Sequence, residues 1–355
     1  MPGLDDLPHE VLLFIVSHLP DDADGAAAIC NLGAASKHLH SVSREDLLWQ
    51  PHYIARWGEC SAQRETDDDS WYASCKYRHT QDVETVQCVE VLVKEKLSRT
   101  AVNTSWRQLV SHGEEALTRV CALCTDEAWL VADGARREEL KRVVVGLNQS
   151  VVRREWVMLL ANTARMTASG AAWGEPAIED GALLLVRLYL TAKQLADGPR
   201  AAAATVRAEL DAIAERLVVA LDAAGQLAVG TRRPVSAVAA VRALSALLFR
   251  EEGFGGNAED YYNYRNSLLD HVLASRKGIP ISLSVLFASV CRRVDVHLDF
   301  IGLPGHFLLA TRPEPGHERI FVDAFHGGEL LDISQCQDST RCVPSPTPTP
   351  NMLWC

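Results

Sequence analysis

Three side chains in the last quarter of the chain have the types and the order of a hydrolytic or acyl-transfer triad. Ser282 offers a hydroxyl nucleophile, His306 a general base, and Asp323 a carboxylate that orients the imidazole. A serine hydroxyl is a weaker nucleophile than a thiolate, so such a site also needs donors that stabilise an oxyanion. The alternative is structural: the serine caps or packs in a helix, while the imidazole and the carboxylate share a hydrogen bond. We favour the structural alternative, because chemistry cannot be transferred from a fold alone.

A helix and three short strands must position these residues. Pro280 suits the first turn of a helix, and the apolar residues after it end at Arg292-Arg293, which predicts a helix over about 280–293. Extended runs separated by Gly and Pro predict strands over 297–301, 306–311 and 319–322. The nucleophile then falls in the first helical turn, the base at the start of the second strand and the orienting carboxylate at the end of the third.

A second group of polar and aromatic residues lies on either side of this helix in the sequence. It comprises Asn257, Tyr261, Tyr262, Arg265, Asn266 and His326. Two interpretations stay open for this group. It lines a pocket beside the imidazole of the triad, or it forms a capping loop in which Asn and Asp side chains bind their own backbone and Tyr rings bury one end.

The stretch from 253 to 331 resembles a known family in several motifs. It contains Gly-Phe-Gly-Gly-Asn at 253–257, Leu-Pro-Gly-His-Phe at 303–307 and Val-Asp-Ala-Phe-His-Gly-Gly at 322–328. These motifs are similar to those of the second transglutaminase-like core family, found in bacterial SirB-type proteins and in F-box proteins of the F-box only protein 21 type. The resemblance implies a papain-like core whose nucleophile, at a helix N-terminus, is normally a cysteine. Here that position holds a serine and Cys291 lies near the far end of the helix, so we expect a pseudoenzyme.

A helical pattern opens the chain. Pro8 begins it, and apolar residues recur at Val11, Leu12, Ile15, Val16 and Leu19. The acidic and Ala-rich stretch 21–28 predicts a loop, residues 29–42 give a second helical pattern, and Leu48-Trp49 closes the motif. Three short amphipathic helices of this size bury too little surface to be very stable alone. They suit docking on another protein or, alternatively, packing as a small hairpin on the chain's own helices.

This N-terminal unit resembles the F-box, which combines Leu-Pro with a nearby Glu, an Ile-x-x-x-Leu ending in Pro, a Leu/Cys-rich middle and a terminal Leu-Trp. The matching residues are Leu7, Pro8, Glu10, Leu12, Ile15, Leu19, Pro20, Cys30, Leu39, Leu48 and Trp49. The resemblance implies binding to a Skp-type adaptor and, through it, to a cullin-RING ubiquitin ligase. The residues that it assigns to adaptor binding are Leu7, Pro8, Glu10, Leu12, Ile15, Leu19, Pro20, Leu48 and Trp49.

Helical patterns fill the chain between these two modules. They run over 86–97, 109–123, 140–147, 178–196 and 205–224. The tail is rich in Ser, Thr and alternating Pro, so it cannot bury a core and is expected to be disordered. The predicted fold is mainly α with a smaller α+β part. Its domains are a three-helix F-box at 1–60, a helical linking region at 61–172, a transglutaminase-like (papain-like) core at 173–335 and the tail at 336–355.

Composition argues against several classes of protein. The 355 residues carry a net charge of −11, which argues against nucleic-acid binding. No window of about 18 uncharged apolar residues occurs, so no membrane span is expected. The ten cysteines follow no framework spacing and predict reduced thiols in the cytoplasm or nucleus. Cys121 and Cys124 are interpreted as helix cysteines in preference to a zinc or redox pair, and we expect neither a metal nor a cofactor.

Together these features predict a non-catalytic substrate-recognition subunit of an SCF-type cullin-RING ubiquitin ligase. The F-box binds the adaptor, and the C-terminal domain holds an unknown target protein near the charged ubiquitin carrier, which raises effective concentration. A hydrolase or acyl-transfer enzyme using Ser282, His306 and Asp323 is the competing hypothesis. An adaptor-bound scaffold without a target is a third.

Overall fold

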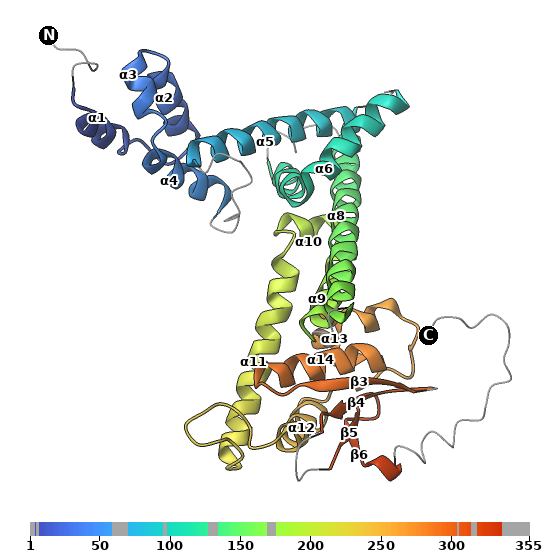
Figure 1. Ribbon diagram of the computed structural model, residues 1–355. Helices are drawn as coiled ribbons and strands as arrows, with labels where there is room; N and C mark the ends of the chain where they lie inside the picture. Colours follow the sequence, from blue (N-terminus) through green and yellow to red (C-terminus); the bar gives the residue numbers. More distant parts are fainter. Residues whose placement is uncertain are drawn as a thin grey trace. The chain divides into compact units, whose positions relative to one another are not determined.

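A computed structural model describes residues 4, 7–58, 70–94, 98–126, 134–168, 175–303, 305–313 and 318–335. The chain forms two compact units, Met1–Val120 and Cys121–Cys355, which are described separately (Figure 1). The tail predicted to be disordered lies outside the described residues, as do the predicted domain boundaries at 60 and 172.

Four short helices begin the first unit, and local chemistry sets where they start. Pro8 precedes the first helix with φ −57°, a value that its ring favours. The carboxylate of Asp22 accepts hydrogen bonds from two backbone N–H groups at the start of the second helix. The hydroxyl of Ser36 accepts one at the start of the third. The helices are α1 (His9–Val16), α2 (Ala23–Gly33), α3 (Lys37–Val42) and α4 (Asp46–Trp57).

The prediction of three helices with a loop over 21–28 is wrong in two respects. The single pattern over 29–42 is two helices, because the Ser36 cap starts a new one. Most of the predicted loop is the first half of α2, because Asp22 caps the helix start and the alanines that follow favour a helix. Gly25 allows close packing there, since a Cβ on it would overlap the carbonyl oxygen of Pro20.

An apolar core closes this four-helix segment. Trp49 lies at its centre, 5% exposed, and its indole Nε1 donates to the carbonyl oxygen of Ser43 at 2.6 Å. The long helix α5 (Trp71–Val93) packs on α4 and contributes Cys75, and burial raises the pKa of that thiol to about 12. The following helix, α6 (Arg99–Leu123), is kinked at Gly113, whose φ of 63° suits glycine.

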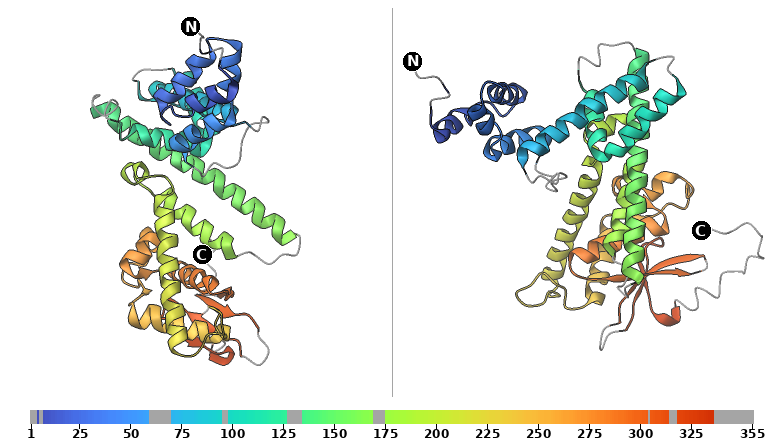
Figure 2. Two further views of the ribbon diagram at one scale, coloured as in Figure 1. Left: turned by 90° about the vertical axis from the view of Figure 1, so that its left-hand side faces the viewer. Right: turned by 45° about the horizontal axis from the view of Figure 1, so that its top comes forward.

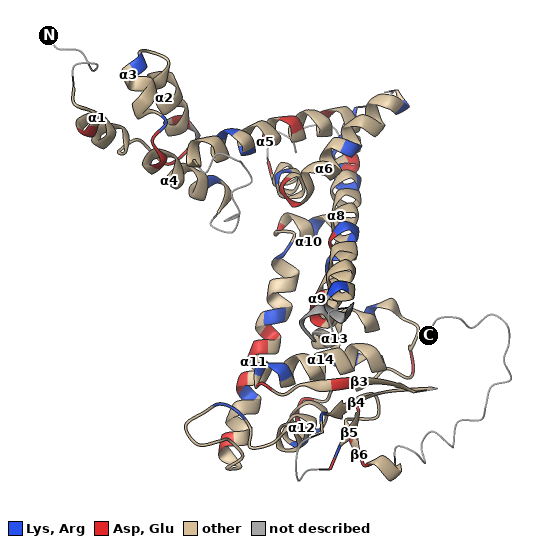
Figure 3. Ribbon diagram, in the orientation of Figure 1, with Lys and Arg blue, Asp and Glu red and all other residues tan. Residues whose placement is uncertain are grey.

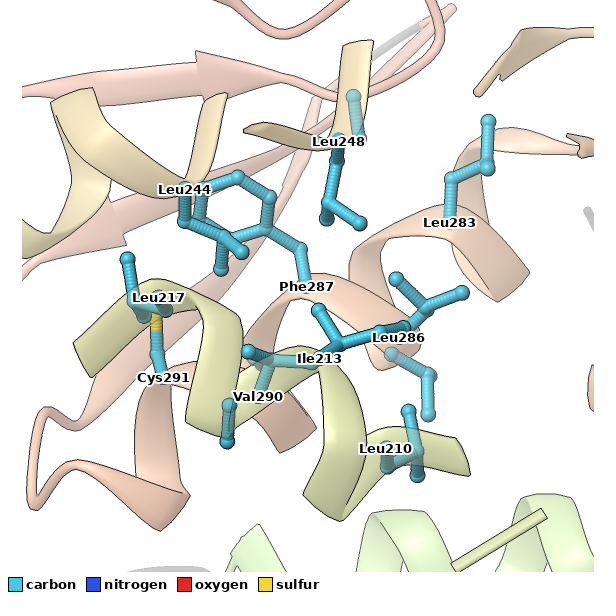
Figure 4. Packing of buried hydrophobic residues seen from close by; sticks show 14 of the residues in the cluster. Leu210, Ile213, Leu217, Leu244, Leu248, Leu283, Leu286, Phe287, Val290 and Cys291 are labelled. Atoms are coloured by element: carbon cyan, nitrogen blue, oxygen red, sulfur yellow. The ribbon is translucent and has the colours of Figure 1, made fainter. Parts of the chain in front are cut away.

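The second unit is built around α14 (Pro280–Arg293), which has the bounds that the sequence predicts. Ten consecutive residues of α14, 282–291, are buried. Figure 4 shows Phe287 of this helix among Leu244 and Leu248, with α11 residues on the other side. The helices before it are α8 (Gly134–Ala168), α9 (Glu175–Leu188), α10 (Ala192–Ala196), α11 (Ala201–Ala223), α12 (Ala237–Ser245), the π-helical turn η3 (Ala246–Glu251), the 3-10 turn η4 (Tyr264–Ser267) and α13 (Leu269–Ser275).

Two small sheets complete the second unit. A parallel pair joins β1 (Gly255–Gly256) to β2 (Lys277–Gly278). An antiparallel sheet has the order β3-β4-β5-β6 and lies against α14 (Figures 1 and 2). Its register pairs Leu298 with Thr311 and Val322 with Leu330. The strands are β3 (Leu298–Leu303), β4 (His306–Thr311), β5 (Phe321–Asp323) and β6 (Glu329–Leu331).

The structure corrects the sequence prediction at several elements of the second unit. The predicted helix over 178–196 is two helices, because Thr191 and Gln194 form a capping box that starts α10. The strand predicted over 319–322 is displaced to Phe321–Asp323, and β6 is an additional strand.

Among the described helices of both units, none combines the length and the apolar composition that a membrane span needs.

A buried carboxylate ties three helices of this unit together. Glu179 of α9 is 3% exposed and accepts hydrogen bonds from the guanidinium groups of Arg292 and Arg293 at the end of α14. Arg293 also donates to Asp211 of α11. Burial raises the pKa of Glu179, but the hydrogen bonds and charges of the two arginines outweigh it and hold that pKa below its ordinary value.

Candidate functional site

Ser282, the predicted nucleophile, donates its hydroxyl proton to a hydrogen bond inside the second unit. It is the third residue of α14 and 4% exposed. Its Oγ lies 2.5 Å from the carbonyl oxygen of Asn266 and 3.2 Å from that of Ile279, and it accepts the N–H of Ile279 at 3.1 Å. No hydrogen bond among the described residues joins Ser282 to an imidazole. The hydroxyl therefore fastens the loop before α13 to the start of α14.

The carboxylate of Asp323 stands at the end of β5, and a different imidazole from the predicted one binds it. Its Oδ2 lies 2.9 Å from Nδ1 of His326 and 3.9 Å from Nδ1 of His306, which is beyond hydrogen-bond reach. Its Oδ1 accepts the backbone N–H groups of Phe325 and His326 at 3.1 Å. A tight turn folds the His326 ring back onto the carboxylate. The structure thus brings two members of the predicted triad close together without a bonded relay from Ser282.

The polar residues before α13 bind one another. The amide nitrogen of Asn266, 5% exposed, donates to the carbonyl oxygens of Asp260 and Tyr261, and its Oδ1 accepts from Asn257 at 3.0 Å. The guanidinium of Arg265 lies over a neighbouring tyrosine ring, 5.9 Å from the centroid. These contacts agree with the capping-loop interpretation of the polar group.

Aromatic rings continue from this loop to the sheet in an unbroken series, here called the ring row. Centroid separations are 5.3 Å from Tyr262 to Tyr261, 5.8 Å from there to Phe325, 5.3 Å on to His326 and 6.3 Å to His306. Tyr262 is 97% exposed. Phe325 was not among the predicted site residues. Its signal was the glycine motif at 253–257, because a Cβ at the second of the paired glycines would overlap that ring.

The residues predicted to bind an adaptor separate into three groups by their exposure. Leu12, Leu48 and Trp49 are buried in their own core, so they form the framework of the segment. Leu7 and Leu19 are half-buried and pack against that core. The exposed members are Pro8, Glu10, Ile15 and Pro20.

Two exposed residues of α1 were missed. Val11 is 42% exposed and Phe14 is 65% exposed, beside Ile15 at 47%. Spacings of three and four place all three on one side of the helix, opposite the buried Leu12 and Val16. The signal was available in the sequence, because a helix that is apolar nearly all round has more apolar surface than one core can cover.

Cys121 and Cys124 lie at the end of α6 and just beyond it. Cys121 is buried and Cys124 is half-buried. Burial raises the pKa of the Cys124 thiol, which disfavours the thiolate form that binds metals and reacts with disulfides. No cluster of three or more metal-binding side chains occurs in the part of the chain that the structure describes.

The fold defines a protein of two modules, a small helical N-terminal segment and a helix-centred α+β core. Residues 4–55 match the F-box-like family, and residues 204–353 match the transglutaminase-like superfamily. The prediction of an F-box segment at the N-terminus and a transglutaminase-like domain at the C-terminus of a mainly helical chain is therefore confirmed.

Particular relatives include both F-box and bacterial proteins. The chain is 37% identical over 101 residues to F-box only protein 21 of Mus musculus, which covers 27% of this chain and 16% of that protein. It is 38% identical over 99 residues to a UPF0162 protein of Xylella fastidiosa, with 28% of this chain and 34% of the relative covered. A UPF0162 protein of Pseudomonas aeruginosa is 30% identical over 142 residues, with 39% and 46% covered. The matches thus span less than half of each relative. No solved structure matches significantly.

We predict that Ser282→Ala destabilises the second unit, because the hydrogen bonds of the hydroxyl are lost. Removing the hydroxyl leaves the Asn266 carbonyl and the Ile279 N–H without that partner, which should cost about 1–3 kcal/mol of unfolding free energy in urea titrations. Ser284→Ala is the matched control, since that hydroxyl is also buried in α14 but has no hydrogen-bond partner. Equal losses in the two variants would contradict this role.

Proposed function

We propose that the chain is the substrate-recognition subunit of an SCF-type cullin-RING ubiquitin ligase, in the cytoplasm or nucleus. The observation that carries the proposal is the exposed apolar side of α1 in a segment that matches the F-box-like family. A hairpin that only packs on its own chain gives no reason for Val11, Phe14 and Ile15 to stay exposed. Covering the exposed half of such side chains is worth about 1 kcal/mol each, so a partner that buries all three gains a few kcal/mol.

The α1 side is expected to bind a Skp-type adaptor. We predict that Phe14→Ser combined with Ile15→Ser reduces adaptor recovered in co-purification by at least about tenfold, because each loses an apolar contact. The unfolding midpoint should stay unchanged, since both side chains are exposed. Val229→Ser, at a fully exposed site far along the chain, is the control for a general loss of apolar surface. If the double variant recovered as much adaptor as the wild type, the proposal would be contradicted.

The second unit is proposed to hold the target protein. The ring row supports this role, because exposed aromatic rings in contact with one another are the side chains that dominate protein interfaces. Holding the target near the charged ubiquitin carrier supplies proximity, and no chemistry is then needed from this chain.

A second candidate, a hydrolase or acyl-transfer enzyme, is favoured by one observation, the position of Asp323 beside two imidazoles. An imidazole paired with a carboxylate can act as a general base. This candidate requires Ser282 to release its proton to that base, so Ser282→Ala should abolish acyl transfer to or from the target. Ubiquitination of the target at the wild-type rate per folded molecule would argue for the receptor instead.

A further inference from the structure

The second half of α8 carries an exposed surface of unusual composition. Val157, Met158 and Leu160 are 63%, 59% and 52% exposed within little more than one helical turn. Single exposed apolar residues are ordinary, but three together on a helix indicate an interaction surface. Arginines flank them on the same side of the helix. We call this set the α8 face, and it consists of Arg153, Val157, Met158, Leu160 and Arg165.

The way charges pair along the helix separates the α8 face from the first half of α8. There, Glu138 pairs with Lys141 at 2.6 Å and Glu139 with Arg142 at 2.7 Å, the usual pattern of a solvated helix surface. From 153 to 165 the single acidic residue is Glu155, which turns toward α9 and pairs with Arg187. Figure 3 shows Lys and Arg recurring along α8. The α8 face is thus locally cationic in a chain whose net charge is −11.

The helical positions form one continuous surface. At 100° per residue, positions 153, 157 and 160 fall within an arc that continues through 165 and 158. Residues 153 to 165 extend for about 18 Å along the helix, which matches about three turns of a partner helix. Methionine and arginine are both enriched at interfaces, the first because it adapts its shape and the second because it binds carboxylates in a fixed geometry.

We propose that the α8 face binds an amphipathic helix of the target protein whose central apolar residues are preceded and followed along the helix by Asp and Glu. This inference rests on the proposed receptor function and specifies the chemistry of the target. The apolar side chains at 157, 158 and 160 require apolar residues in the middle of the partner segment, and the arginines before and after them along α8 require carboxylates toward both of its ends. A second copy of this chain would bring arginines against arginines. The chain's own acidic segment, 65–69, has no apolar side chain to fill the centre.

The test uses the full chain and two designed helical peptides of about 20 residues, enough for five turns. Both carry Leu residues on one side of their central turns; one has Glu in its first and last turns and the other has Lys there. Fluorescence anisotropy should show binding of the Glu peptide, at least about tenfold tighter than the Lys peptide. Raising NaCl from about 50 to about 500 mM should weaken the Glu peptide by several-fold, because exposed charges are screened.

Variants assign this binding to the α8 face. Arg153→Glu with Arg165→Glu should weaken the Glu peptide at least about tenfold and strengthen the Lys peptide, an exchange of preference that unfolding cannot produce. Val157→Ser with Met158→Ser should weaken both peptides. Arg142→Glu makes the same change of charge on the same helix outside the α8 face and should alter neither affinity.

Three outcomes would overturn the inference. The two peptides bind equally or not at all, or the charge exchange leaves the preference unchanged. A third is a concentration-dependent dimer in sedimentation that Val157→Ser with Met158→Ser abolishes, which would assign the surface to a second copy. Adaptor co-purification on the same samples separates the two hypotheses. If the adaptor binds and the Glu peptide does not, the α8 inference alone fails, whereas the reverse result removes the receptor function.

Discussion

Replacing Phe287 by alanine is expected to destabilise the second unit by about 3–5 kcal/mol, the usual cost of emptying a fully buried phenylalanine site. The side chain has no exposed surface, and its ring stacks on Phe249 with centroids 6.2 Å apart. Leucines from two other segments surround it (Figure 4). Because residues 282–291 of α14 are all buried, the surrounding helices cannot collapse into the space without moving the sheet. This loss is a large share of the stability of an ordinary domain.

Urea denaturation of the full chain, followed by far-UV circular dichroism, measures this effect. Ile281→Ala provides the matched control, because Ile281 lies on the same helix but is 50% exposed. We expect that control to change the unfolding free energy by about 1 kcal/mol or less. Similar losses for the two variants would mean that α14 is not the centre of the core.

Removing the carboxylate of Glu179 should be nearly as damaging. Glu179→Ala leaves Arg292 and Arg293 with side chains 22% and 15% exposed and without their shared acceptor. Breaking a pair of this kind costs about 3–5 kcal/mol, since Arg292 loses its carboxylate partner and Arg293 keeps only the exposed Asp211. Glu215→Ala is the control, because that carboxylate also binds an arginine but is 65% exposed and should contribute about 1 kcal/mol or less.

The same pair makes the stability depend on pH in a defined direction. The folded protein holds the pKa of Glu179 below the ordinary value of 4.5, so the unfolded chain takes up a proton first as the solution is acidified. The contribution of the pair is therefore complete above about pH 4.5 and is lost as pH falls through the lowered folded value. Wild type and Glu179→Ala should differ most in unfolding free energy near neutrality and converge in acid. A difference that grew on acidification would contradict the sign of this linkage.

The sequence predicted an element best where specific residues mark both its start and its end. Pro280 and the Arg292-Arg293 pair fixed both ends of α14. Strand β6 escaped because three residues are too few to show a period, and it is defined by its pairing with β5. The break between α9 and α10 escaped because the apolar pattern continues through it. A local cap sets the position of such a break, and the apolar pattern does not show it.

The candidate sites were predicted by residue type more reliably than by partner. Asp323 was expected to bind His306, but the turn after β5 presents His326, and Gly327 and Gly328 permit that turn with φ of 73° and 69°. In α1, a motif match mixed framework residues such as Leu12 with surface residues such as Ile15. A motif records which residues recur together, whereas the direction of each side chain follows from helix geometry.

The role of Ser282 as a fastener has a consequence for how this core can change over generations. A side chain that holds two segments together cannot become a free nucleophile by a single substitution, because cysteine at this position would be a weaker hydrogen-bond donor to the Asn266 carbonyl. Acquiring chemistry here would require a second change that anchors the loop by other means. Each step alone lowers stability before any activity exists to be selected, so selection for stability retains the present arrangement.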